Sequence, residues 1–141
     1  MKNAKKNDIF AHMLQRIQTV WMALATFGAL FLYLSWGDLE LIGGNIVKLA
    51  VPVLLILLGA LSIFSYRNRK RQLMLNSISL IINVLLIGVL LYSLLNLSGG
   101  IDFPKKGIEP LFPLISIVSL LIANHYIRKD ERLVKSVDRL R

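Results

Sequence analysis

The sequence contains no cysteine and only two histidines among its 141 residues. The absence of thiols excludes disulfide bonds, thiol–disulfide exchange and a lipid-modified cysteine anchor. Metal sites need several ligands at fixed spacing, which His12 and His125 cannot supply alone. A haem held between them is geometrically conceivable, but a snorkelling or hydrogen-bonded histidine is the commoner state at an interface. We therefore expect neither a metal nor another cofactor.

The chain also lacks the residue patterns on which common enzymes depend. It has no glycine-rich phosphate loop, no Ser/His/Asp triad and no pair of carboxylates facing a cleft. Its long apolar runs contain no acidic residue, which argues against a small proton-coupled antiporter with a membrane-embedded carboxylate. We therefore predict that the protein is not an enzyme.

Four long apolar runs stand in place of these features, in a chain that is 55% hydrophobic. A helix rises 1.5 Å per residue, so about 20 residues cross about 30 Å of hydrocarbon. Pro52 and Pro113 are expected near helix starts, where first-turn amides lack partners. The sequence predicts an all-α membrane protein, a single domain of four transmembrane helices in an up-down bundle with short outer loops. The runs without Asp, Glu, Lys or Arg are 17–36, 49–66, 73–97 and 111–127.

Basic residues lie mostly on one side of this predicted topology. Of the 17 Lys and Arg, all but Lys48, Lys105 and Lys106 fall in the two terminal segments or in residues 67–72. Because cytoplasmic loops are enriched in Lys and Arg, we expect both termini and residues 67–72 to be cytoplasmic. The net charge of +9 is then a sign of topology, and we expect no nucleic acid partner.

The basic segment 128–141 is predicted to continue as an amphipathic cytoplasmic helix. Leu133, Val137 and Leu140 recur at spacings of four and three, and Glu131 and Lys135 form a favourable i,i+4 pair. This helix either lies against anionic headgroups or is a solvated flank of the last span. Both interpretations stay open.

Polar side chains converge on the cytoplasmic half of the bundle. Asn76, Ser79 and Asn83 fall within about 60° of one another on one helix, so they should face the bundle interior. They form either an interhelical hydrogen-bonded layer or part of a ligand pocket, and the first is the commoner use of such residues. The predicted layer consists of Thr19, Asn76, Ser79, Asn83 and Asn124.

A second set of polar and basic residues is expected at the cytoplasmic surface. Arg16 is singled out, because its guanidinium could clamp a carboxylate of Asp130 or Glu131 in two-point fashion, or else extend to lipid phosphate. The expected partner or lipid contacts are Gln15, Arg16, Gln18, Arg67, Arg69, Lys70, Arg71, Arg128, Lys129 and Arg132.

Both ends of the chain carry specific motifs. The segment Met13 to Ala25 opens with Gln15-Arg16-Ile17-Gln18-Thr19, and the segment Ile122 to Arg141 contains Arg128-Lys129-Asp130-Glu131. These motifs resemble those of an uncharacterised four-helix integral membrane protein family of Bacteroidota, a domain-of-unknown-function family. The resemblance covers the chain from Met13 onward, implies that residues 1–12 are an extension or a longer start, and implies a bacterial inner membrane. It supplies no activity, but it implies that the cytoplasmic ends carry the function.

Two functions are compatible with these features. The first is a non-enzymatic structural or accessory protein whose basic cytoplasmic face binds a membrane-protein partner, a second copy of the chain or anionic lipid. The second is a small-molecule or lipid transporter in which the polar layer around Asn83 forms an inward-facing pocket. We favour the first, because the apolar spans contain no ionisable centre of the kind that marks a transport pathway.

Overall fold

Four helices make up the computed structural model, which describes residues 2–35, 44–96 and 108–139, with side chains at 16–35, 44–96, 108–136 and 139. All four are long and apolar enough to cross a membrane, which confirms the all-α class and the number of candidate spans. The helices are α1 (Lys2–Ser35), α2 (Gly44–Phe64), α3 (Arg69–Leu95) and α4 (Leu111–Asp138).

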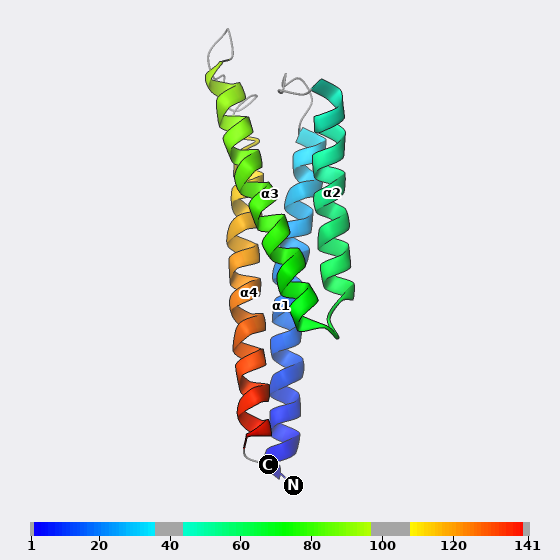
Figure 1. Cartoon of the computed structure of the whole chain (residues 1–141), viewed down its shortest axis with the longest axis vertical. Helices are drawn as coiled ribbons and strands as arrows, with labels where there is room; N and C mark the ends of the chain where they lie inside the picture. The colour runs from blue at the N-terminus through cyan, green and yellow to red at the C-terminus, as the bar shows by residue number, and fades with distance from the viewer. Residues whose placement is uncertain (1, 36–43, 97–107, 140–141) are drawn as a thin grey trace.

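The helices form a bundle in which each packs against the next and α4 returns to pack against α1 (Figure 1). The α1–α4 interface is the most extensive, and these two helices extend together beyond the turn between α2 and α3. The beginning of α1, the end of α4 and the α2–α3 turn therefore lie toward one end of the bundle, which we call the basic end.

The helices are longer than the apolar runs that predict them. Helix α2 begins at Gly44, before the predicted span start at residue 49, and Gly44 has a φ of 64°, which glycine adopts without steric cost. Pro52 consequently lies inside α2 and not in its first turn, so its expected place was wrong. The reason is that an apolar run ends at the first charged side chain, here Lys48, whereas a helix continues through lysine readily.

A short turn reverses the chain between α2 and α3. The Ser65 amide donates to the Leu61 carbonyl at 2.9 Å, and the Asn68 amide donates to the Ser65 carbonyl at 2.9 Å. The Asn68 side chain then accepts from the Arg71 amide and caps α3. This turn places the basic residues that flank Asn68 at the basic end.

Glycine permits close contact at two helix interfaces. A Cβ on Gly28 of α1 would collide with the Ser116 hydroxyl of α4 and lie 3.2 Å from the Phe112 carbonyl oxygen. A Cβ on Gly59 of α2 would collide with the Thr26 side chain of α1. Small residues let helix backbones approach closely, which is the main source of packing energy inside a bilayer.

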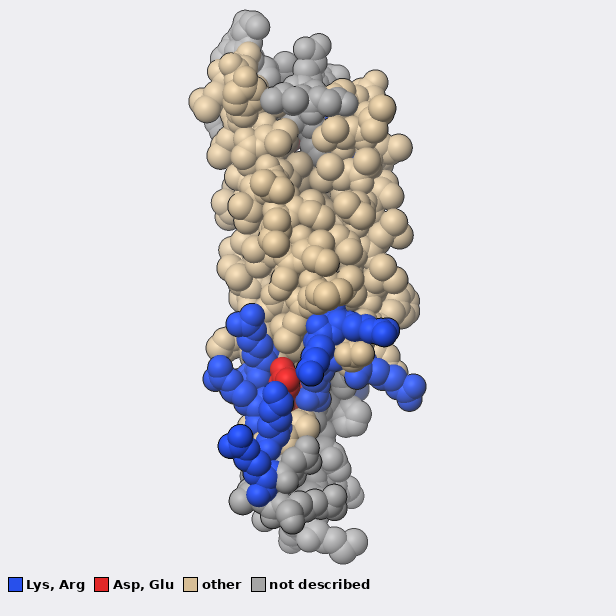
Figure 2. Space-filling view, in the orientation of Figure 1, with Lys and Arg blue, Asp and Glu red and all other residues tan. Residues whose placement is uncertain are grey.

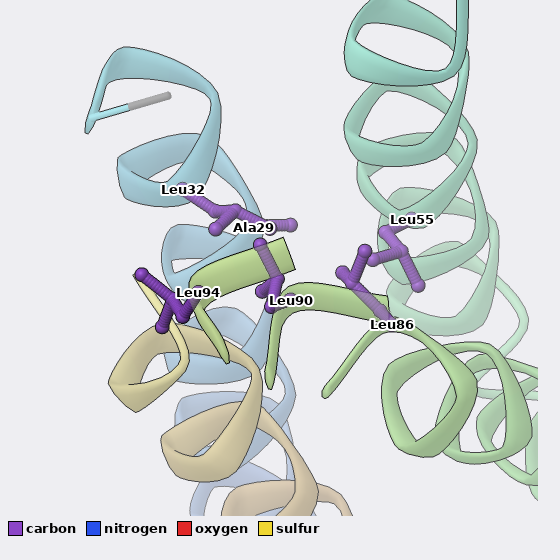
Figure 3. Close-up of a cluster of buried hydrophobic side chains, with 6 residues drawn as sticks. All are labelled: Ala29, Leu32, Leu55, Leu86, Leu90 and Leu94. Carbon is purple, nitrogen blue, oxygen red and sulfur yellow. The ribbon is translucent and has the colours of Figure 1, made fainter. Parts of the chain in front are cut away.

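Two apolar clusters lie at different levels of the bundle. Figure 3 shows the larger one, in which side chains from α1, α2 and α3 meet. The smaller cluster, nearer the basic end, consists of Met22, Ala123 and Ile127. The larger cluster consists of Ala29, Leu32, Leu55, Leu86, Leu90 and Leu94.

Candidate functional site

A chain of buried hydrogen bonds links three helices at the level of the smaller apolar cluster. The Ser62 hydroxyl of α2 donates to Asn76 Oδ1 of α3 at 2.6 Å, and Asn76 Nδ2 donates to Asn124 Oδ1 of α4 at 3.0 Å. Ser62 and Asn76 are each 1% exposed and Asn124 is 8% exposed. We call these three residues the polar ladder. Each carboxamide thereby gains the partner that burial away from water demands.

Asn83 and Ser79 lie beside the ladder and make a different kind of contact. Asn83 is buried, as its helical spacing from Asn76 and Ser79 predicts. Its Nδ2 donates at 2.8 Å to the Ser79 backbone carbonyl of the same helix. Asn76, Ser79 and Asn83 line a cavity of about 10 Å³ against Thr26. A single water molecule needs about this much room, whereas ligand pockets occupy about 300–1,000 Å³. This cavity is therefore not a ligand chamber.

The side chains of α1 are rotated relative to the prediction. Thr19 is exposed and does not belong to the buried polar layer, whereas Gln18, expected at the surface, is 5% exposed. The buried face of α1 contains Gln18, Met22 and Ala25, because α1 must face α2 and α4 together. Gln18 Nε2 has no hydrogen-bond partner among the described residues. The side chain of Gln15 lies outside the described residues.

One buried residue of this region was missed by the sequence analysis. Gln72 of α3 is 3% exposed, and its Nε2 lies 3.1 Å from Met22 Sδ of α1, a weak acceptor. Its position four residues before Asn76 places it on the same helical stripe, so the spacing alone could have identified it.

Asp130 of α4 pairs with Arg69 of α3 near the start of that helix. Asp130 Oδ2 lies 2.9 Å from Arg69 Nη2, and the Asp130 side chain is 7% exposed. Glu131 pairs instead with Lys135 at 2.9 Å within α4. Both acidic residues are thus engaged elsewhere, so the predicted clamp to Arg16 is wrong, and Arg16 is exposed on α1. The reason is that Asp130 faces the first turn of α3, where Arg69 reaches it.

Six further basic residues form an exposed surface at the basic end. Figure 2 shows Lys and Arg gathered in a band there, below an uncharged surface. Within the described residues, Arg69 and Lys135 are in ion pairs, whereas no basic residue of this surface is. We call it the basic surface, and it consists of Arg67, Lys70, Arg71, Arg128, Lys129 and Arg132.

These features were compared with known proteins. Neither the curated proteins nor the solved structures give a match. A protein-family model does match, and it covers residues 14–140, a range that includes the polar ladder, the Arg69–Asp130 pair and the basic surface. The chain therefore belongs to the family described as a domain of unknown function, DUF4293.

Proposed function

We propose that the protein is a non-enzymatic, multi-pass protein of a bacterial inner membrane, with both termini cytoplasmic, and that it serves as a structural or accessory subunit. The bacterial origin rests on the resemblance of its terminal motifs to a family of Bacteroidota. The orientation rests on the excess of Lys and Arg at the basic end, because positively charged segments are retained in the cytoplasm.

The basic surface is the observation that carries this proposal. Its six exposed cations come from the α2–α3 turn, the start of α3 and the end of α4, and among the described residues none of the six is in an ion pair. Like charges held together on a rigid scaffold repel one another and attract an anionic partner. The partner classes that fit are an acidic surface of another membrane protein and the anionic headgroups of the bilayer.

The buried interior supports a scaffold better than a transporter. The transporter hypothesis places its pocket around Asn83, and the cavity there has room for about one water molecule. The carboxamides of Asn76 and Asn124 are already bonded to each other. The polar layer thus acts as a link between helices, which leaves the exposed surface to do the binding.

Copurification tests the proposal. The full-length protein is extracted in mild detergent, and bound proteins and lipids are identified for the wild type, for the triple variant Arg67→Gln, Lys70→Gln, Arg71→Gln and for a control. The control, Lys48→Gln with Arg139→Gln, removes charge outside the basic surface. We expect the wild type and the control to retain an acidic protein or anionic lipid that the triple variant loses. Equal retention of every bound protein and lipid by all three proteins and by the variant Arg128→Gln with Arg132→Gln would contradict the proposal.

A further inference from the structure

A groove of about 970 Å³ runs along the outside of the bundle between α3 and α4. This volume is at the upper end of the range for ligand pockets. The part of the groove farther from the basic end is apolar and is lined by Leu80 and Ile81 of α3 and Leu121 of α4. These residues belong to the uncharged apolar runs 73–97 and 111–127, so in a bilayer this part of the groove would face acyl chains.

The other part of the groove is cationic. Arg128, Lys129 and Arg132 of α4 line it together with Leu133 and Ser136, and all three cations are exposed. Arg128 follows Leu121 by seven residues, or about 10 Å along the helix. Ser77 and His125 line the groove between the apolar and cationic parts. Along its length the groove therefore changes from apolar to polar to basic.

The two acidic residues of α4 whose side chains the structure describes, Asp130 and Glu131, do not neutralise this charge. Asp130 is buried and bound to Arg69, and Glu131 is bound to Lys135. Neither carboxylate lines the groove. Among the residues whose side chains the structure describes, none of the three cations at its end is in an ion pair, which leaves them able to bind an anion.

We infer that this groove binds one anionic phospholipid of the leaflet at the basic end. An acyl chain lies along Leu80, Ile81 and Leu121, and the phosphate is bound by the cations at the other end of the groove. Only an amphiphile with a negative head matches the observed order of apolar and basic side chains. Guanidinium groups bind phosphate oxygens in two-point fashion, and basic pockets between membrane helices are known headgroup sites. A soluble phosphate ester would leave the apolar part of the groove without a ligand.

The inference rests on the proposed function and narrows it to one ligand at one place, so the test separates the two. The purified full-length protein is titrated with phosphatidylglycerol, phosphatidylcholine and glycerol phosphate, and the bound lipid is counted by native mass spectrometry. The groove variant Arg128→Gln with Arg132→Gln is compared with Lys48→Gln plus Arg139→Gln, which removes the same charge outside the groove. A second groove variant, Leu121→Trp, fills the apolar part without changing charge.

We expect the wild type and the charge control to bind one phosphatidylglycerol in preference to phosphatidylcholine, with no competition from glycerol phosphate. The groove charge variant should bind it at least about tenfold more weakly, because each basic residue near a membrane surface contributes about fivefold. The Leu121→Trp variant should also lower occupancy, with an unchanged melting temperature.

Equal affinity of the groove charge variant and the charge control would overturn the inference, since binding would then depend on net charge alone. Displacement of the bound phosphatidylglycerol by glycerol phosphate would overturn the inference too, because the acyl chain would then contribute nothing to binding. A third outcome is that phosphatidylglycerol is not retained but an acidic protein copurifies and is lost when Arg67, Lys70 and Arg71 are changed. The inference of a lipid site in the groove would then be wrong, and the proposed function would stand. If neither ligand is found, both fail.

Discussion

Asn76 of α3 and Asn124 of α4 form a hydrogen bond of 3.0 Å inside the bundle, although they are 48 residues apart in the sequence. Asn76 also accepts from Ser62 of α2, so its carboxamide is shared between two neighbouring helices. A partner lost here leaves a polar group buried among apolar side chains, and such groups are costly in hydrocarbon. Asn76 therefore links α2, α3 and α4 to one another.

Replacing Asn76 with Leu should lower the free energy of unfolding by about 1–2 kcal/mol, since both of its interhelical hydrogen bonds are lost. Replacing Asn83 with Leu should cost less, because Asn83 Nδ2 bonds only to the Ser79 carbonyl of its own helix. Thermal or chemical unfolding in a fixed detergent measures both. An Asn83 variant that is less stable than the Asn76 variant would show that the ladder does not hold the helices together.

The close contact between α1 and α4 at Gly28 gives a second prediction. Gly28→Ala should destabilise the protein by about 1–3 kcal/mol, because the new methyl group collides with the Ser116 hydroxyl and approaches the Phe112 carbonyl. Gly88 of α3 is the matched control, since a Cβ there meets no atom within 4 Å. Gly88→Ala should stabilise by up to about 1 kcal/mol through helix propensity. Melting temperatures that move in the same direction for the two variants would contradict this packing.

The Arg69–Asp130 pair predicts a coupling that the exposed pair on α4 does not share. A double-mutant cycle of Arg69→Gln and Asp130→Asn should give an interaction energy of about 1 kcal/mol, because Asp130 is nearly buried. The Lys135–Glu131 pair should give a smaller interaction energy, because solvent screens an exposed i,i+4 pair.

Arg16 serves as the control for this cycle. Arg16→Gln combined with Asp130→Asn should be additive within about 0.3–0.5 kcal/mol, since Asp130 is engaged by Arg69. A strong coupling between Arg16 and Asp130, with none between Arg69 and Asp130, would support the Arg16–Asp130 ion pair and contradict the Arg69–Asp130 pair.

The parts of the fold that follow from hydropathy could be predicted from the sequence. The four helices, and the burial of Asn76, Ser79 and Asn83 on one face of α3, depend on local spacing, and the structure agrees with them. The choice between Gln18 and Thr19 could not be predicted, because both are polar and adjacent. Which of them is buried depends on the rotation of α1 against α2 and α4.

The ion-pair partner of Asp130 could not be predicted from the sequence for a related reason. Arg16 and Arg69 are both basic residues expected at the same membrane face, so charge alone cannot choose between them. The turn at Asn68, which starts α3 beside the end of α4, makes the choice. Tertiary contacts of this kind are set by the packing of distant segments and carry no local signal.

The final prediction concerns the orientation of the protein in the membrane. Because the chain contains no cysteine, a single introduced cysteine reports on its own position. Asn45 at the start of α2 and Ser136 near the end of α4 are both exposed and lie at opposite ends of the bundle. In intact cells, a membrane-impermeant thiol reagent should label the Asn45→Cys variant and not the Ser136→Cys variant. Permeabilised cells should show both labelled, which controls for reactivity. Labelling of Ser136→Cys alone in intact cells would show that the orientation is the reverse of the predicted one. The basic surface would then face away from the cytoplasm.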